Sequence, residues 1–210
     1  MYNGDRKSFQ GAPMKNLVAF LVILGIIGGI AMKYINAFPV LDETVKEKWA
    51  QVQNQYKRRA DLIPNLVKTV QGYASHEEGV FKEVTEARSK ASQMTIDVSS
   101  LDDPAKLKEF ENAQKTLGGA LSRLMAITEN YPQLKADQNF LSLQSQLEGT
   151  ENRIAVARKD YIAAVKDYNI ALRKIPDKFI AAIFYPELKP RVTFEASEAE
   201  QSAPDVSFAK

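Results

Sequence analysis

The chain has no cysteine and only one histidine, His76. Without cysteine it forms no disulfide, has no thiolate nucleophile or Cys-ligated zinc, and offers no cysteine for lipid attachment. His76 and Glu77 begin like the H-E-x-x-H helix of zinc proteases, but the second histidine that would complete a metal-binding face is missing. The pair is better interpreted as polar residues on a helix surface, and we expect no metal and no cofactor.

An excess of charge of one sign is also lacking, because 28 Lys and Arg are interspersed with 26 Asp and Glu. Proteins that bind nucleic acid usually gather basic residues on one face, so we expect no nucleic-acid partner. Glycine-rich phosphate loops and the G-x-S-x-G elbow of serine hydrolases are absent from the sequence. We therefore predict that the protein is not an enzyme.

One stretch lacks charge altogether: NLVAFLVILGIIGGIAM, residues 16–32, between Lys15 and Lys33. As a helix it covers about 26 Å, and if Lys33 snorkels, the segment 16–36 is long enough to cross a bilayer. A cleaved signal peptide is the alternative, but the apolar run exceeds a usual signal core and a good cleavage site is missing. Gly25 and Gly29 form a G-x-x-x-G pair of the kind that packs membrane helices together.

Apolar residues then recur every seven positions, which predicts a long helix from about 40 to 95. Because this register passes Pro64 without a slip, we expect the helix to be kinked there rather than cut. The seam positions are Trp49, Tyr56, Ile63, Val70, Val84 and Ala91, with partners at Val45, Val52, Leu66, Tyr73, Val80, Ala87 and Met94.

Residues 96–104 predict a turn, in which Asp102 or Asp103 caps a helix with Pro104 in its first turn. That helix should stop near residues 130–132, and a second long helix should follow and end at Pro176. The second helix has the clearest pattern, with Phe140, Leu147, Ile154, Tyr161, Tyr168 and Ile175 seven apart and Leu143, Ala157, Ala164 and Ala171 beside them. We expect a short apolar helix over 178–184, and Val192 and Phe194 extended against the bundle.

Blocks rich in strand formers are absent, so the predicted fold class is all-α. A single transmembrane helix (16–36) follows a short tail (1–15) and precedes an elongated antiparallel bundle (38–184) of a long kinked helix, a shorter helix and a long helix. The remainder (185–210) should be an extended tail, disordered beyond Glu195. The shorter helix would leave apolar coiled-coil seams exposed at the ends of the long pair, so we expect a homo-oligomer.

Two polar clusters interrupt the seams of the long helices. The first contains Arg58, Arg59 and Asp61 beside Pro64, and the second contains Glu148, Glu151, Asn152 and Arg153 beside Gly149. Glycine inside a helix costs roughly 1 kcal/mol relative to alanine, and close contact with another helix is one reason to keep it. The clusters are interpreted either as ion pairs that set helix register or as a docking site for a partner.

These motifs give the chain a resemblance to a known family. RRADLIPNLV (58–67), followed by GYA (72–74) and His76-Glu77, and LEGTENRI (147–154), followed by Ala157-Arg158, Tyr161 and Tyr168-Asn169, resemble the signatures of the LemA family. The ending FYPELKPRVTFEA (184–196) is similar as well, whereas FPVLDETV (38–45) departs from the family pattern before the first long helix. The resemblance implies a bacterial single-pass membrane protein with a helical body, no transferable catalytic residues, and links to membrane metalloproteases or TPM-domain proteins.

The sequence thus predicts a membrane-anchored helical scaffold or adaptor that self-associates and organises partner proteins at the bacterial cytoplasmic membrane. Basic residues are equal in number on the two sides of the segment 16–36, so they do not indicate its orientation. A long domain can translocate regardless of charge, which favours an extracytoplasmic body. A transmembrane signal relay is the alternative, although 15 residues are too few for a receiving module. A membrane-shaping or lipid-contacting assembly is a third, and it requires an apolar or basic outer face.

Overall fold

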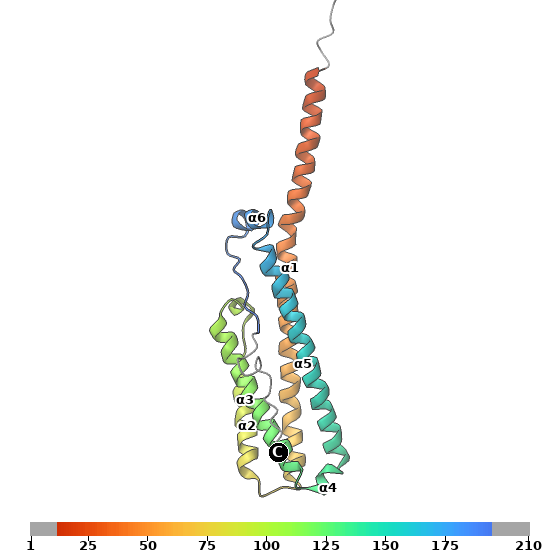
Figure 1. Cartoon of the computed structure of the whole chain (residues 1–210), viewed down its shortest axis with the longest axis vertical. Helices are drawn as coiled ribbons and strands as arrows, with labels where there is room; N and C mark the ends of the chain where they lie inside the picture. The colour runs from red at the N-terminus through yellow and green to blue at the C-terminus, as the bar shows by residue number, and fades with distance from the viewer. Residues whose placement is uncertain (1–11, 195–210) are drawn as a thin grey trace, which may run out of the picture.

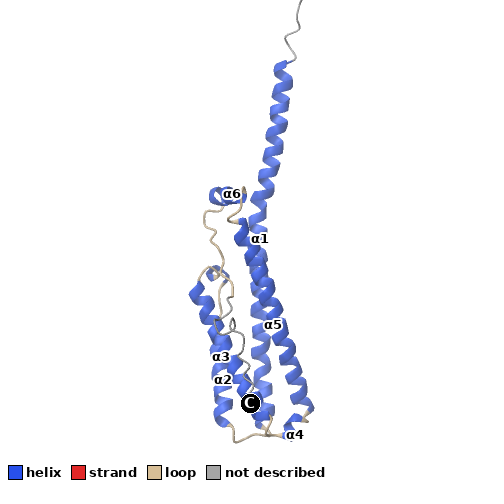
Figure 2. Cartoon of the chain, viewed as in Figure 1, coloured by secondary structure: helices blue, strands red, loops and turns tan. Residues whose placement is uncertain are grey.

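The computed structural model describes residues 12–194, and the disorder expected beyond Glu195 falls outside the described residues. Every regular element within that range is helical, which confirms the all-α class (Figure 2). In chain order the elements are α1 (Ala12–Gln71), α2 (Glu78–Gln93), the 3₁₀ turn η1 (Val98–Ser100), α3 (Pro104–Thr128), α4 (Pro132–Lys135), α5 (Gln138–Ala171) and α6 (Asp177–Phe184).

The helices form an elongated antiparallel bundle at one end of α1 (Figure 1). The first part of α1 stands alone, and its second part packs along α5, while α2 packs along α3. The short α4 closes the far end of the bundle, and α6 lies crosswise at the end where α1 emerges (Figure 1). The chain after α6 returns along the bundle to Phe194.

The predicted single helix over 40–95 is wrong. Helix α1 continues through Pro64 as expected, but it ends at Gln71, and a turn over 72–77 reverses the chain into α2. The error has a clear origin, because Val70 and Val84 lie fourteen positions apart on opposite sides of the turn and both are buried. The seven-residue register therefore persists by coincidence across two helices that face one core, and the bundle contains four main helices instead of three.

The predicted seams form most of the core. Their buried members include Val45, Trp49, Val52, Ile63, Leu66, Val70, Val84, Phe140, Leu147, Ile154, Tyr161 and Tyr168. Val80, Met94 and Leu143 are half-buried, and two seam positions are exposed. Tyr73 lies in the turn after α1, and Ile175 is 74% exposed because α5 ends at Ala171 and not at Pro176.

The shorter predictions are confirmed in detail. The Asp103 side chain caps α3 by accepting from the Ala105 and Lys106 amides, with Pro104 in the first turn. Phe194 is buried in the core, and the Val192 amide donates to the Leu101 carbonyl at 2.9 Å, so this segment lies extended against the bundle.

Two prolines lie inside α1, and each leaves the carbonyl four residues earlier without its helical N–H donor. Side chains from other parts of the fold supply both donors. Arg88 Nε of α2 donates to the Ala60 carbonyl at 2.7 Å, opposite Pro64. The Tyr185 hydroxyl donates to the Ile35 carbonyl at 3.2 Å, opposite Pro39. Since buried carbonyls need partners, these bonds explain how one helix tolerates two internal prolines.

The Arg88 bond gives a testable double-mutant cycle. Arg88→Met should lower the free energy of unfolding by about 1–3 kcal/mol, because the Ala60 carbonyl loses its donor. In a Pro64→Ala background, where residue 64 regains its N–H, the same change should cost clearly less. The measurement is urea unfolding of the full chain in detergent, followed by far-UV circular dichroism.

Arg123→Met is the control, because Arg123 is mostly exposed and, among the described residues, pairs with Glu83 alone at the surface. It should cost little in either background. Equal costs of Arg88→Met in the two backgrounds would show that Arg88 does not compensate for Pro64.

Candidate functional site

A single buried arginine connects the four main helices. Arg59 of α1 is 5% exposed, and its Nη1 donates to a Glu151 carboxylate oxygen of α5 at 3.0 Å. Its Nη2 donates to both the carbonyl and the side-chain oxygen of Gln114 on α3. Gln114 in turn donates through Nε2 to the Ala91 carbonyl of α2 at 3.4 Å. We call Arg59, Gln114, Glu151 and the Ala91 carbonyl the polar layer.

The environment of the polar layer is asymmetric. The Arg59 guanidinium lies 5.0 Å from the centre of the Tyr56 ring, and its Nε is buried with no hydrogen-bond partner among the described residues. Glu151 is half exposed, so water also solvates its carboxylate. Burial raises the pKa of Tyr56 despite the opposing charges of Arg158 and Arg59, so this phenol stays neutral. The layer therefore contains one buried cation whose countercharge reaches the surface.

This geometry favours the register interpretation of the first cluster. Sliding α1 along α5 by one heptad would leave the Arg59 charge in an apolar core without a carboxylate. Apolar clusters lie on both sides of the layer: one is built around Ile63, Leu66 and Leu124, and the other around Trp49 and Tyr161.

The other members of the predicted clusters do not join the layer. Arg58 is exposed, and Asp61 pairs with Lys57 at 3.3 Å on the surface of α1. Glu148 is exposed and accepts from Gln144. Asn152 and Arg153, which also belong to the second cluster, are exposed to solvent.

Within the described residues, Gly149 makes no close contact with another helix. A Cβ built on Gly149 would meet only Arg153 Nη1, at 3.9 Å, and no other helix. Gly149 instead begins an outward-facing line on α5, spaced by seven, that continues with Val156, Ala163 and Ile170. Val156 and Ile170 are large exposed apolar residues, and we call this line the outer seam.

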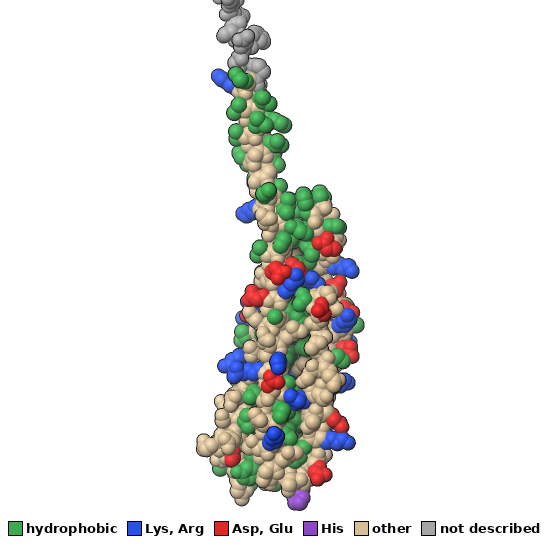
Figure 3. All heavy atoms as spheres, turned by 180° about the vertical axis from the view of Figure 1, so that it is seen from behind, with side chains coloured by type: hydrophobic (Ala, Val, Ile, Leu, Met, Phe, Trp, Pro, Cys, Tyr) green, Lys and Arg blue, Asp and Glu red, His purple; other side chains and the backbone are tan. Residues whose placement is uncertain are grey.

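His76 and Glu77 lie in the turn between α1 and α2, at the far end of the bundle (Figure 3). His76 is exposed, and Glu77 accepts from the Tyr131 hydroxyl at 3.5 Å. Within residues 12–194, no three side chains of His, Cys, Asp or Glu gather closely enough to hold a metal ion. At the other end of α1, Gly25 and Gly29 have open space around them.

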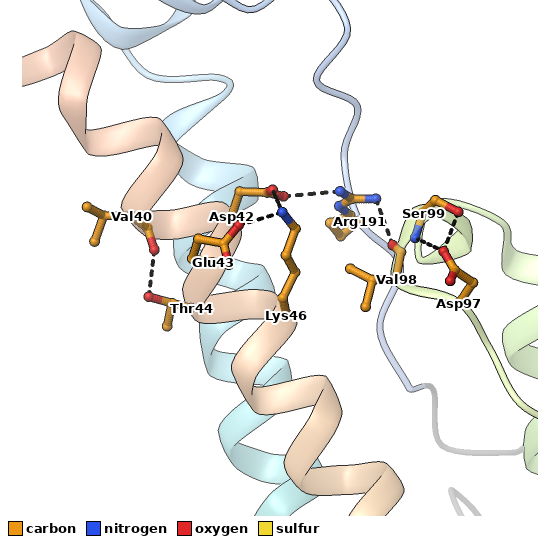
Figure 4. Close-up of polar contacts among 9 residues, drawn as sticks. All are labelled: Val40, Asp42, Glu43, Thr44, Lys46, Asp97, Val98, Ser99 and Arg191. Atoms are coloured by element: carbon orange, nitrogen blue, oxygen red, sulfur yellow. Dashed lines mark hydrogen bonds and ion pairs between the residues drawn. The ribbon is translucent and has the colours of Figure 1, made fainter.

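Sequence reasoning missed a second polar junction, centred on Arg191 (Figure 4). Arg191 Nη2 bonds to Asp42 of α1 at 3.1 Å, and Nη1 donates to the Val98 carbonyl at 3.4 Å. Its backbone exchanges two hydrogen bonds with the Asn169 side chain of α5. Asp42 lies 149 positions away in the chain, so no local pattern in the sequence could reveal this pair.

Asp42 is stabilised in its charged form. Its burial alone would raise its pKa, but hydrogen bonds and charges from Lys46 and Arg191 outweigh burial and hold the pKa of Asp42 below its ordinary value. The carboxylate thus fastens the segment after α6 to α1.

A groove of about 480 Å³ opens beside the polar layer, between α1, α2 and α3. Its floor includes Tyr56, Ala60 and Phe110, and the Lys57–Asp61 ion pair lies at its rim. Arg88 lines it as well, next to the proline-released carbonyl of Ala60. Of the surfaces described, this groove best fits the docking interpretation of the first cluster.

The fold defines a class of protein: a helical bundle that continues from an exposed apolar helical segment and contains a buried polar layer. Among the described residues, that helix, Met14–Gln71, is the one long and apolar enough to cross a membrane, and none of its most apolar window is buried. The chain belongs to the LemA family, whose pattern matches residues 48–208, so the resemblance of the motifs is confirmed.

The sequence identity to individual relatives is low. The chain is 28% identical over 183 residues to magnetosome protein MamQ 2 of Paramagnetospirillum magneticum, covering 80% of this chain and 67% of that protein. It is 28% identical over 182 residues to magnetosome protein MamQ of Magnetospirillum gryphiswaldense, covering 79% of this chain and 66% of the relative. Protein LemA of Metamycoplasma hominis is 23% identical over 191 residues, covering 91% of this chain and 82% of its own length.

The asymmetry of the polar layer predicts unequal effects of removing its two charges. Glu151→Ala should lower the free energy of unfolding by about 1–3 kcal/mol, because it leaves a buried guanidinium group without a countercharge. Arg59→Met should cost less and leave the helical content native, because water still solvates the half-exposed Glu151. The measurement is urea unfolding of the full chain in detergent.

Glu148→Ala is the matched control, since Glu148 is exposed one turn away on the same helix. It should change stability by only a few tenths of a kcal/mol. If Glu148→Ala and Glu151→Ala cost the same, the buried cation does not depend on Glu151.

The lowered pKa of Asp42 predicts an acid dependence. The ion pair with Arg191 is fully present above the ordinary aspartate pKa of 3.8 and is lost as pH falls through the lower pKa of the folded state. The free energy of unfolding should therefore fall more steeply in wild type than in Asp42→Asn as pH drops below 3.8. Fluorescence of Trp49, the only tryptophan, reports the transition because its ring lies 6.0 Å from Phe194.

Glu43→Gln provides the control, because Glu43 is exposed and, within residues 12–194, pairs with Lys46 alone. It should follow the wild-type pH curve. Parallel curves for wild type and Asp42→Asn would rule out this role for Asp42.

Proposed function

We propose that the protein is a non-enzymatic, membrane-anchored helical scaffold that self-associates and holds partner proteins beside the bacterial cytoplasmic membrane. The observation that carries this proposal is the continuity of α1, which runs as one helix from an exposed apolar segment to the far end of the bundle. A bundle built on its own anchor helix begins at a defined distance from the apolar segment.

The dimensions support a scaffold. From residue 41 to its end, α1 extends about 45 Å, so the bundle projects well beyond the lipid headgroups. The polar layer and the Arg191 junction tie this length of α1 to α2, α3, α5 and the returning chain. A rod fixed at several levels presents its surfaces at defined heights above the membrane.

Self-association is proposed through two surfaces. The outer seam of α5 exposes Val156 and Ile170 beside the open backbone of Gly149, and small residues allow helices to approach closely. In the apolar part of α1, Gly25 and Gly29 present the same opportunity within the bilayer.

Partner proteins are proposed to dock at the groove beside the polar layer. Its apolar floor and ion-paired rim suit an amphipathic helix. A membrane metalloprotease or a TPM-domain protein is the partner class that the family resemblance suggests. The likeness to proteins named for the magnetosome supports a role in assembling a cellular structure. We place the body on the extracytoplasmic side, where a long domain can translocate regardless of flanking charge.

Crosslinking in intact membranes tests the proposal. The chain lacks cysteine, so Val156→Cys creates a unique thiol on the outer seam. We expect disulfide-linked dimers through position 156, labelling of this thiol by a membrane-impermeant maleimide in spheroplasts, and crosslinks from the groove to another membrane protein identified by mass spectrometry. The matched control is Ser89→Cys, which is exposed on α2 away from the outer seam and should give few dimers.

Gly149→Ala separates stability from assembly. In one chain alanine should stabilise α5 by up to about 1 kcal/mol, since the added Cβ meets only the Arg153 side chain, in ordinary van der Waals contact at 3.9 Å. If copies pack at the outer seam, the same change should reduce dimers through position 156. Equal dimer yields at positions 156 and 89 would contradict assembly through the outer seam. Release of the protein from membranes by alkaline carbonate would contradict anchoring.

A further inference from the structure

Helix α6 exposes an apolar face that neither the bundle core nor the polar junctions use. Ile175, Phe179 and Ile183 follow one another at intervals of four along this part of the chain, and all three are exposed, Ile183 by 72%. Phe184 is also more than half exposed. Figure 3 shows apolar side chains gathered at the end of the bundle where α1 emerges. We call Ile175, Phe179, Ile183 and Phe184 the α6 face.

The opposite side of α6 is firmly attached to α1. Ala181 of α6 is buried against Phe38 of α1, and Ile180 packs on the same cluster. The Tyr185 ring lies 5.8 Å from the Phe38 ring, and the Tyr185 hydroxyl donates to the Ile35 carbonyl that Pro39 leaves free. These contacts set the position of α6 along the axis of α1.

That position coincides with the end of the apolar segment. Twenty residues from Asn16 to Ile35 make a helix of about 30 Å, which equals the hydrocarbon thickness of a typical bilayer. If the segment spans the membrane, Ile35 and Phe38 lie at its surface. Helix α6 runs crosswise to α1 there (Figure 1), so its axis would lie in the plane of the membrane surface.

Basic side chains surround the α6 face. Arg173 and Lys178 are exposed, and Lys174 reaches Asp177 at 3.7 Å while remaining more than half exposed. Each Lys or Arg near an anionic membrane contributes about 1 kcal/mol of attraction. An exposed apolar face bordered by cations is the pattern of a helix that lies in the lipid headgroup region.

We propose that α6 is an interfacial helix whose Phe179, Ile183 and Phe184 insert into the same leaflet that α1 enters, with Arg173, Lys174 and Lys178 on anionic headgroups. The inference rests on the membrane anchoring proposed above. It commits to lipid as the occupant because the α6 face adjoins the exposed apolar surface of α1, which ends at Ile35. With α1 it gives the body a second attachment that prevents tilting and rotation about α1.

The test is depth measurement on the full chain reconstituted in vesicles of phosphatidylethanolamine and phosphatidylglycerol. Single cysteines are placed at Ile183 (Ile183→Cys), in the apolar part of α1 (Leu21→Cys) and on α5 away from the membrane (Val156→Cys), and each carries a bimane fluorophore. Lipids with a nitroxide group on the acyl chain should quench the probes at 183 and 21 and leave 156 unquenched. Because all three side chains are exposed, none of the changes should alter the thermal unfolding midpoint.

The outcomes separate this inference from the anchor itself. Quenching at 21 without quenching at 183 overturns the interfacial role of α6 and leaves anchoring intact. Absence of quenching at both positions overturns anchoring and the inference with it. Absence of quenching at 183, together with disulfide-linked dimers when unlabelled Ile183→Cys is treated with a thiol oxidant, would assign the α6 face to a second copy, which also overturns lipid insertion.

A charge variant tests the headgroup contacts separately. Changing Arg173, Lys174 and Lys178 together to glutamine should reduce quenching at 183 in vesicles with phosphatidylglycerol and have little effect in vesicles of phosphatidylcholine alone. The control replaces Lys82 and Lys90, exposed on α2, with glutamine and should leave quenching unchanged. Equal quenching of wild type and the triple variant in anionic vesicles would overturn the headgroup contacts.

Discussion

The arrangement of the bundle depends on placing one guanidinium group inside an apolar core. A buried cation is tolerated only where its charge and its N–H groups find partners. Arg59 finds them on α3 and α5, and Gln114 extends the chain of bonds to α2. Heptad seams alone permit several registers, since shifting by seven residues again places apolar side chains on apolar side chains. A register shifted by seven residues would separate the Arg59 guanidinium from Glu151 and Gln114, so the polar layer disfavours the alternatives.

The same requirement, that buried polar groups be paired, recurs at other levels of the molecule. Each proline in α1 releases a carbonyl, and each released carbonyl accepts from a side chain of a distant element, Arg88 or Tyr185. Arg191 repeats the principle with Asp42 and Val98. Prolines that would weaken an isolated helix become attachment points here, because the missing helical bond is replaced by a bond between elements. Helix α1 is thus connected to α2 at Ala60 and to the chain after α6 at Ile35 and Asp42.

The sequence predicts the helices and their apolar faces well. It indicates tertiary partners only where a polar residue interrupts an apolar seam. Regular seams identified much of the core, and Asp103 with Pro104 identified the start of α3. Arg59 stood out because a charge occupied a seam position, and the second cluster pointed to the region of its partner. Glu151 could not be singled out from Glu148 and Arg153 without the rotation of α5, which the packing of four helices sets.

Other features could not be predicted from this one sequence. The turn over 72–77 was hidden because the apolar register continued across it. The roles of Arg88, Tyr185 and Arg191 depend on contacts with residues far away in sequence, and each lies in an ordinary local context. The short apolar helix over 178–184 was predicted from the sequence, but the significance of the α6 face depends on its position beside Phe38.

The geometry also constrains what kind of partner the proposed scaffold could hold. Arg59 lies 24 residues beyond Ile35 along one helix, which places the polar layer and its groove about 36 Å from the membrane surface in an upright bundle. A bundle tied to the leaflet only through α1 could lean and bring the groove near the lipid, whereas attachment through α6 as well would hold it upright. A partner that reaches the groove must then carry a domain or an extended segment that projects by a similar distance. Upright attachment thus favours membrane proteins with large domains outside the bilayer over small integral proteins that remain within it.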